Sequence, residues 1–226
     1  MPRTLSSTTP ARALNSAAPR LSRRETLVLV AAMPWLMPGL ASAAPPTPLF
    51  DGKTLGAWKP ISFGGEGEVS VVNGAIRLER GNDLTGVVWT GKLPGPSYRL
   101  QMEAMRVDGS DFFCAVTFPV GRSHCTFVVG GWGGTVVGFS SLDGLDASEN
   151  ETSHTVTFEN HRWYEVAVEV TTTHIKGFID GKVVAEAATA GKDVDVRIEM
   201  LPCRPLGVAS WRTVADIRNI TLEERA

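Results

Sequence analysis

Apolar and polar residues alternate along most of the chain after residue 49, and this alternation predicts β-strands. In the range 98–104, apolar residues stand at every second position, and the positions between them are Arg, Gln and Glu. The ranges 164–171 and 194–200 alternate in the same way. A period of two places one set of side chains on each face of an extended strand, so one face is buried and the other is wet. About eleven or twelve such strands are predicted, and no stretch has the period of a helix.

Two dipeptides separate short apolar runs as hairpin turns do. These are Asn73-Gly74 and Asp180-Gly181, and both favour two-residue turns with positive φ. Strands joined in this way, without crossover helices, pair antiparallel, so the sequence predicts an all-β, two-sheet β-sandwich. The last strand, through 217–222, is expected to return beside the first.

Residues 1–43 differ from the rest of the chain and are predicted to be an export signal. They carry five arginines and one acidic residue, and an apolar stretch over 27–40 ends in Ala-Ser-Ala at 41–43. About fourteen apolar residues are too few to cross a bilayer core of roughly 30 Å as a helix. We therefore expect no stable membrane span after signal cleavage, a Pro-rich lead over 44–48 and a single domain over 49–226.

The segment from Ser22 to Leu27 resembles the twin-arginine export signal. Arg23 and Arg24 form the pair, and Thr26 stands where a large apolar residue is usual. Twin-arginine export is the leading expectation, with ordinary secretion and a cytosolic chain with a basic tail as alternatives. The mature protein is therefore expected in the periplasm or outside the cell.

Net charge and cysteine content limit which ligands and partners the protein is expected to bind. The 226 residues have a formal net charge of −2, which provides no basic footprint for nucleic acid. The three cysteines, Cys114, Cys125 and Cys203, are an odd number and match no zinc spacing. Buried free thiols are expected, with one disulfide as the alternative.

The opening of the predicted domain carries a family resemblance. Residues 49–58 read Leu-Phe-Asp-Gly-Lys-Thr-Leu-Gly-Ala-Trp, which resembles the first motif of the 3-keto-disaccharide hydrolase family. Further matches follow at 72–76, 98–107, 162–164 and 179–182. The resemblance implies a concanavalin-like or laminin-G-like jelly roll. For some members it implies cleavage of glycosides that carry a ketone at the third sugar carbon.

Two segments depart from the family pattern. Ser-Asp-Phe-Phe-Cys stands at 110–114 where Asn-Ser-Gly and an apolar run are common, and His-Cys-Thr-Phe stands at 124–127 where an acid and a Gln commonly alternate. The resemblance therefore implies the fold more directly than the reaction.

A 3-keto-glycoside needs few catalytic groups. The ketone acidifies the proton at the second carbon, so a base can remove it, the aglycone can leave from the first carbon, and water can then add. We expect His124 to be the base and Asp111 to orient it, because they flank a predicted hairpin; a structural pair is the alternative. Glu149 is the expected acid, with Glu151 as the alternative, and either could instead be a metal ligand; Arg204 is expected to donate to sugar oxygens.

Two further features suggest ligand contacts. Trp132 lies among four glycines, which favours a sugar platform or, alternatively, a buried corner ring. The segment 143–151, called the acidic loop below, contains four acids and no Lys or Arg. It is either solvated or a site for a divalent cation such as Ca²⁺, with Asp146 and Glu151 as ligands. Asn150 is expected to bind sugar hydroxyls, and no organic cofactor is expected.

Three functions remain open at this point. The first is an exported enzyme that cleaves 3-keto-glycosides, and the second is a non-catalytic glycan-binding, lectin-like module. The third is an interaction domain that docks on another exported protein. Both of the first two have carbohydrate as the partner.

Overall fold

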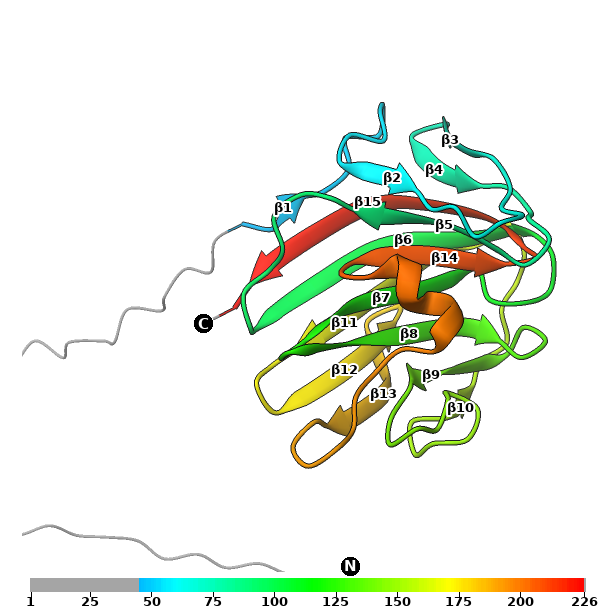
Figure 1. The fold of residues 1–226 in the computed structure, drawn as a ribbon. Coiled ribbons are helices and arrows are strands. Elements are labelled where there is room, and N and C mark those ends of the chain that lie inside the picture. Colours follow the sequence, from blue (N-terminus) through cyan, green and yellow to red (C-terminus); the bar gives the residue numbers. More distant parts are fainter. Residues whose placement is uncertain (1–44, 226) are drawn as a thin grey trace, which may run out of the picture. The chain divides into compact units, whose positions relative to one another are not determined.

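The computed structural model describes residues 45–225 as two antiparallel β-sheets packed face to face (Figure 1). The strands are β1 (Thr47–Pro48), β2 (Trp58–Pro60), β3 (Val69–Val72), β4 (Ala75–Leu78), β5 (Leu84–Trp89), β6 (Tyr98–Asp108), β7 (Cys114–Val120), β8 (Ser123–Gly131), β9 (Val136–Ser140), β10 (His154–Thr155), β11 (Trp163–Val170), β12 (His174–Ile179), β13 (Lys182–Ala188), β14 (Gly207–Trp211) and β15 (Val214–Glu224). A 3₁₀ helix, η1 (Ile198–Cys203), precedes β14.

The two sheets have different strand orders. The eight-stranded sheet has the order β13-β12-β11-β6-β15-β4-β3, with β1 also paired to β15. The seven-stranded sheet has the order β10-β9-β8-β7-β14-β5-β2. All strand pairs are antiparallel. The predicted all-β, two-sheet sandwich is therefore confirmed.

Both predicted tight turns are present. Asn73 and Gly74 join β3 to β4 with φ values of 51° and 80°, and Asp180 and Gly181 join β12 to β13 with φ values of 49° and 74°. Two consecutive residues with positive φ match the twist of the flanking strands in a two-residue hairpin. These dipeptides thus fix two of the hairpin connections of the eight-stranded sheet.

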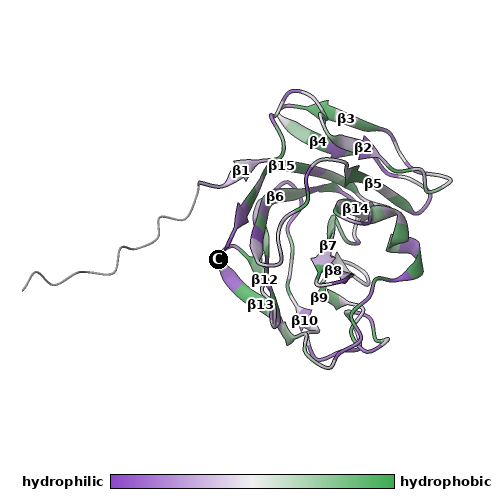
Figure 2. Ribbon diagram, turned by 60° about the vertical axis from the view of Figure 1, so that its left-hand side comes forward, coloured by the Kyte–Doolittle hydropathy of each residue, from purple (hydrophilic) through white to green (hydrophobic). Residues whose placement is uncertain are grey.

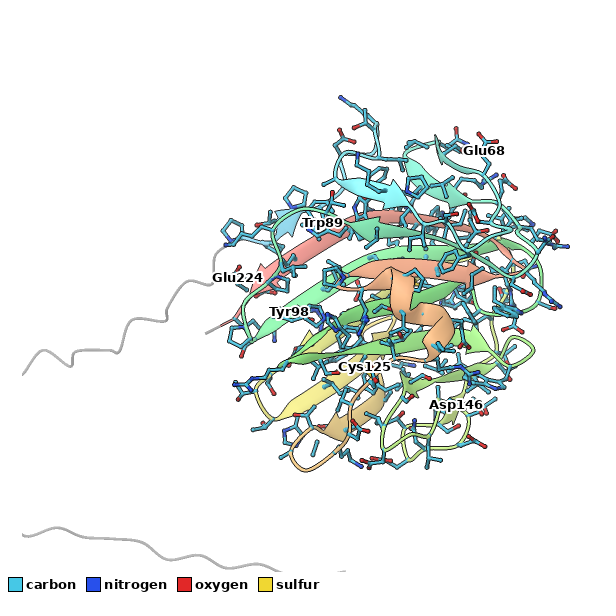
Figure 3. All side chains as sticks on the ribbon, in the orientation of Figure 1. Glu68, Trp89, Tyr98, Cys125, Asp146 and Glu224 are labelled. Atoms are coloured by element: carbon cyan, nitrogen blue, oxygen red, sulfur yellow. The ribbon has the colours of Figure 1, made fainter. Side chains whose placement is uncertain are left out.

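The core lies between the two sheets. In β6, Tyr98, Leu100, Met102 and Ala104 are buried while the residues between them are partly exposed. They pack in one cluster with inward residues of the seven-stranded sheet, which include Phe127. The three cysteines are buried and free, and burial raises the pKa of the Cys125 thiol to about 12. Cys125 is labelled in Figure 3.

The predicted strand over 194–200 is wrong. Val194 makes one isolated bridge to Leu142, and η1 then begins at Ile198. The segment buries Val196 and Met200 against the outer face of the seven-stranded sheet, while Ile198 is 81% exposed. Residues 193–195 make backbone hydrogen bonds with 141–143, directly after β9, but the pairing does not continue and the chain turns into η1. Figure 2 shows η1 on the side of this sheet turned away from the eight-stranded sheet.

The two ends of the described chain meet in the eight-stranded sheet. Thr47 pairs with Leu222 and Pro48 with Thr221, so the last strand returns beside the first as predicted. Strand β1 lies inside the segment that was expected to be only a lead. The predicted export signal falls outside the described residues. Within residues 45–225 no helix has both the length and the apolar character that crossing a membrane requires.

Candidate functional site

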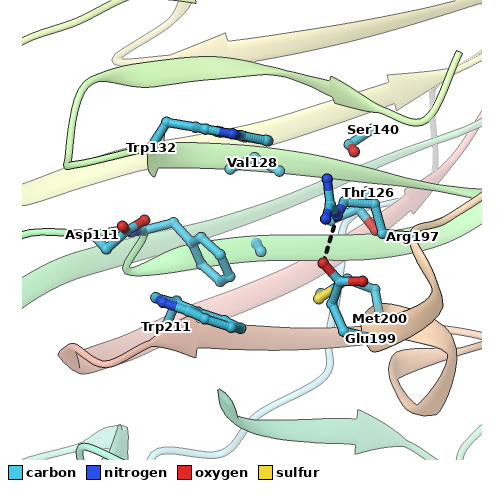
Figure 4. Close-up of a pocket in the computed structure, with 11 residues that line it drawn as sticks. Asp111, Thr126, Val128, Trp132, Ser140, Arg197, Glu199, Met200 and Trp211 are labelled. Atoms are coloured by element: carbon cyan, nitrogen blue, oxygen red, sulfur yellow. Dashed lines mark hydrogen bonds and ion pairs between the residues drawn. The ribbon is translucent and has the colours of Figure 1, made fainter. Parts of the chain in front are cut away.

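A pocket of about 230 Å³ lies on the outer face of the seven-stranded sheet, beside η1 (Figure 4). Strands β7, β8, β9 and β14 and the turns next to them form its floor and sides, and η1 with the residue before it closes one end. Its lining residues are Asp111, Phe112, Ala115, Thr126, Val128, Trp132, Ser140, Arg197, Glu199, Met200 and Trp211.

Strand alternation directs the floor residues into this pocket. In β8, Cys125, Phe127 and Val129 belong to the core between the sheets, so Thr126 and Val128 point to the opposite face. Thr126 pairs with Ser140 of β9, and both residues therefore lie on the same face. The floor is thus a direct consequence of the period-two pattern of adjacent strands.

Two tryptophans stand on opposite sides of the floor in Figure 4. Trp211 ends β14, Trp132 follows β8, and β7 lies between these two strands, which places the strands roughly 10 Å apart. Trp132 has a φ of 48° and is 43% exposed, so it is the exposed ring that a sugar platform requires and not a buried corner ring. Trp211 packs against Phe112 with ring centroids 6.3 Å apart.

Charged groups occupy the two ends of the pocket. At one end, Asp111 accepts hydrogen bonds from the N–H groups of Phe112 at 2.8 Å and Gly133 at 3.2 Å. At the other end, Arg197 donates to Glu199 at 2.5 Å and to Asp146 at 2.7 Å. The Glu199 carboxylate raises the pKa of Arg197, so the guanidinium stays charged. Asp146 thereby fixes the position of Arg197 from the acidic loop.

The expected approach of Asp111 and His124 does not occur. In the β7–β8 hairpin, Cys114 pairs with Val129 and Pro119 with His124. Five residues of strand separate these pairs, or roughly 16 Å, and Asp111 lies beyond the far one. His124 instead faces Arg204 and Asp195, and burial followed by the charge of Arg204 lowers its pKa.

The acidic loop is held by cations of this chain. Asp146 pairs with Arg197 at 2.7 Å, and Glu151 pairs with Lys192 at 2.6 Å. Lys192 also pairs with Asp143 at 3.3 Å, so these acids have cationic partners from the segment before η1. No cluster of three or more His, Cys, Asp or Glu side chains suited to a metal ion is found among residues 45–225. The two expected Ca²⁺ ligands, Asp146 and Glu151, thus serve in ion pairs.

Asn150 is a structural residue, contrary to the prediction that it contacts sugar. Its side chain is buried, and Nδ2 donates to the carbonyl oxygens of Phe139, Leu145 and Asp146. Its Oδ1 accepts from the backbone N–H and the hydroxyl of Thr152. These bonds use the whole amide, which therefore stabilises the turn of the acidic loop.

The other predicted site residues lie outside the pocket lining. Glu149 is exposed on the acidic loop, and Arg204 is exposed directly after η1. Of the predicted residues, only Asp111 and Trp132 line this pocket.

Sequence reasoning missed nine of the eleven lining residues, among them Arg197, Glu199 and Trp211. Arg197 and Glu199 were assigned to the solvent-facing side of a strand that does not form, and no individual role was predicted for Trp211. Trp211 follows the apolar run of β14, and that position was the only available signal. No local sequence pattern predicted that Trp211 lies opposite Trp132.

The fold is a concanavalin-like jelly roll, and it is similar to several solved structures of proteins that act on or bind carbohydrate. The β-glucanase of Bacillus licheniformis superposes with a TM-score of 0.54 at 13% identity, covering 79% of this chain and 97% of that one. The carbohydrate-binding module CBM66 of Bacillus subtilis gives 0.51 at 13% identity, with 74% and 96% covered. The VIP36 lumenal domain, in a form bound to Ca²⁺ and Man3GlcNAc, gives 0.52 at 9% identity, with 76% and 85% covered.

The family model of the 3-keto-alpha-glucoside-1,2-lyase-like domain matches residues 45–223, and the chain belongs to this family. This confirms the resemblance read from the opening motif. A search of curated protein sequences gives no match.

Proposed function

We propose that this protein is an exported carbohydrate-active enzyme that binds a 3-keto-glycoside in the pocket and cleaves it by elimination followed by hydration. The observation that carries the proposal is the pocket itself, in which Trp132 and Trp211 flank a floor that has carboxylates at both ends. Aromatic rings match the apolar faces of a sugar ring, and carboxylates and guanidinium groups match its oxygens. Family membership supports the choice of substrate.

Binding follows from the shape and the chemistry of the lining. In the proposed complex, a sugar ring lies in the pocket against the exposed ring of Trp132, and its hydroxyl groups bond to Asp111 at one end. The backbone N–H groups that hold Asp111 leave its oxygens able to accept further hydrogen bonds, because each carboxylate oxygen has more than one lone pair. Asp111 is therefore assigned to substrate binding.

Glu199 and Arg197 are assigned to the elimination step, as the base and as the group that stabilises the enolate. In the proposed reaction, the Glu199 carboxylate removes the proton from the second sugar carbon, and the resulting enolate carries negative charge on the ketone oxygen. Arg197 lies beside Glu199 and stabilises that charge. The enolate then re-forms the ketone and expels the glycosidic oxygen from the first carbon, which takes the proton held by Glu199. Water adds to the resulting enone and gives the free 3-keto sugar.

The decisive assay is release of p-nitrophenol from p-nitrophenyl 3-keto-α-glucoside by the wild type and by Glu199→Gln. The variant is expected to bind the substrate and to lose about 10²–10⁴ of the rate, the contribution of a general base. Glu186→Gln is the matched control, because Glu186 is an exposed, ion-paired acid on β13, a strand of the other sheet. Full activity in Glu199→Gln would remove Glu199 as the base.

A glycan-binding module without catalysis is the second candidate, favoured by the similarity to CBM66 and by the departures at 110–114 and 124–127. It predicts that calorimetry detects binding of the same compound with no p-nitrophenol released. In either case Trp132→Ala is expected to weaken binding by roughly 2- to 10-fold through lost contact with the sugar face. Unchanged binding in that variant would place the ligand elsewhere.

Export is part of the proposal, and the sequence of 1–43 supports it. In a bacterial host with a twin-arginine pathway, the protein is expected in the periplasmic fraction as a chain shortened near residue 43. Replacing Arg23 and Arg24 together by Lys should retain it in the cytoplasm. Unchanged export of that variant would favour ordinary secretion.

A further inference from the structure

A row of three hydroxyl side chains crosses the outer face of the seven-stranded sheet, and two of them lie in the floor of the pocket. Thr117, Thr126 and Ser140 lie on β7, β8 and β9, where Thr117 pairs with Thr126 and Thr126 pairs with Ser140. All three face away from the core between the sheets, because their neighbours on each strand belong to it. The row thus ends at Ser140, and both Thr126 and Ser140 line the pocket.

Two of the three hydroxyl groups in this row pair with each other, and within residues 45–225 the hydroxyl of Ser140 is unpaired. The hydroxyl oxygens of Thr117 and Thr126 are 2.8 Å apart and share a hydrogen bond. Ser140 is 1% exposed, and its Oγ has no hydrogen-bond partner among the described residues. Buried hydroxyl groups are nearly always paired, because an unpaired one loses its bonds to water without replacement. A buried, unpaired hydroxyl that lines a pocket is available to pair with a ligand.

We propose that Ser140 Oγ is a binding group for an oxygen of the bound ligand, at the floor of the pocket near the end held by Arg197 and Glu199 (Figure 4). This inference rests on the proposed function, and it names a residue that selects a ligand with an oxygen substituent at that point. The ligand class is a sugar ring, whose hydroxyl and ketone oxygens both pair with a serine hydroxyl.

An unpaired hydroxyl gives a distinctive combination of effects. Ser140→Ala removes the ligand contact, and it also removes a buried polar group that has no partner in the free protein. We therefore expect binding of p-nitrophenyl 3-keto-α-glucoside to weaken by roughly 3- to 10-fold. The melting temperature of the free variant should equal or exceed that of the wild type. If the hydroxyl served only the fold, its removal would lower the melting temperature and leave ligand binding unchanged.

Ser210→Ala is the matched control. Ser210 is also 1% exposed, but its hydroxyl donates to the carbonyl oxygen of Thr213 at 2.9 Å, and it points away from the pocket on β14. Its loss should lower the melting temperature and leave the dissociation constant unchanged. The pair of variants separates a hydroxyl that binds ligand from one that holds the fold.

Titration calorimetry and thermal unfolding of the full chain and both variants test the proposal. Weaker binding by Ser140→Ala at an unreduced melting temperature supports it. Unchanged binding, or a melting temperature lowered as much as in Ser210→Ala, overturns it. Absence of binding by the wild type would refute the proposed function and this inference together, whereas binding by the wild type that Ser140→Ala preserves refutes this inference alone.

Discussion

Gly177 is a position where a single added methyl group would disturb the packing of the two sheets against each other. This residue lies in β12 of the eight-stranded sheet, and a Cβ there would lie 2.4 Å from Cε2 and 2.6 Å from Cζ of Phe127 in β8. Ordinary carbon–carbon contact is roughly 3.5–4.0 Å, so the ring would have to move by about 1 Å. Phe127 has little freedom to move, because its ring packs against Phe139 with centroids 5.3 Å apart.

We expect Gly177→Ala to lower the free energy of unfolding by about 1–3 kcal/mol, the usual cost of overpacking a core. For a domain of this size each kcal/mol corresponds to roughly 2–4 °C in melting temperature. Because Phe127 lies between Thr126 and Val128 of the pocket floor, a displaced β8 should also weaken ligand binding. Calorimetric or fluorescence-detected unfolding measures the first effect, and titration with ligand measures the second.

Two comparisons test the steric reasoning. Gly95→Ala is the matched control, because the added methyl group would meet only the Glu224 carboxylate at 3.9 Å, and no loss of stability is expected. In a Phe127→Leu background, Gly177→Ala should cost much less than in the wild type, since the smaller side chain leaves room. An equal loss in both backgrounds would refute the contact with Phe127 as the cause.

Three further predictions concern charge. Backbone N–H groups of Gly65, Gly64 and Phe63 lower the pKa of Glu66 to about 2. Because the pKa of this carboxyl group is higher in the unfolded chain, Glu66 stabilises the fold above about pH 4.5. This contribution is lost as the pH falls towards 2. Urea unfolding of Glu66→Gln should thus show lower stability at pH 7 and a weaker decline below pH 4.5, and parallel pH profiles would contradict this. Burial and the charge of Arg204 lower the pKa of His124, so Arg204→Ala should raise that pKa in an NMR titration, and no change would place the cause in burial alone. Millimolar CaCl₂ should leave the melting temperature unchanged, because Lys192 and Arg197 already pair with the acidic loop. A rise in melting temperature that depends on the CaCl₂ concentration would instead indicate that the protein binds calcium.

The sequence by itself determined the properties that depend on neighbouring residues. Alternation over 98–104 and 164–171 identified strands of the eight-stranded sheet, because a half-buried strand imposes its period on the chain. Asn73-Gly74 and Asp180-Gly181 identified two hairpins, because few dipeptides tolerate two positive φ values. The opening motif identified the family, and free buried cysteines were also expected correctly.

Only the tertiary structure decided which of these residues share a site. Trp132 and Trp211 are far apart in the sequence, and they line one pocket because β8, β7 and β14 are neighbours in the strand order. Asp111 and His124 are close in sequence, yet the register of their hairpin puts them at opposite ends. The range 194–200 has the alternation of a strand, yet it makes one bridge at Val194 and then forms η1 on the outer face, which brings Arg197 and Glu199 to the pocket. Strand order, register and strand pairing depend on distant parts of the chain. A local pattern of apolar residues therefore does not determine them.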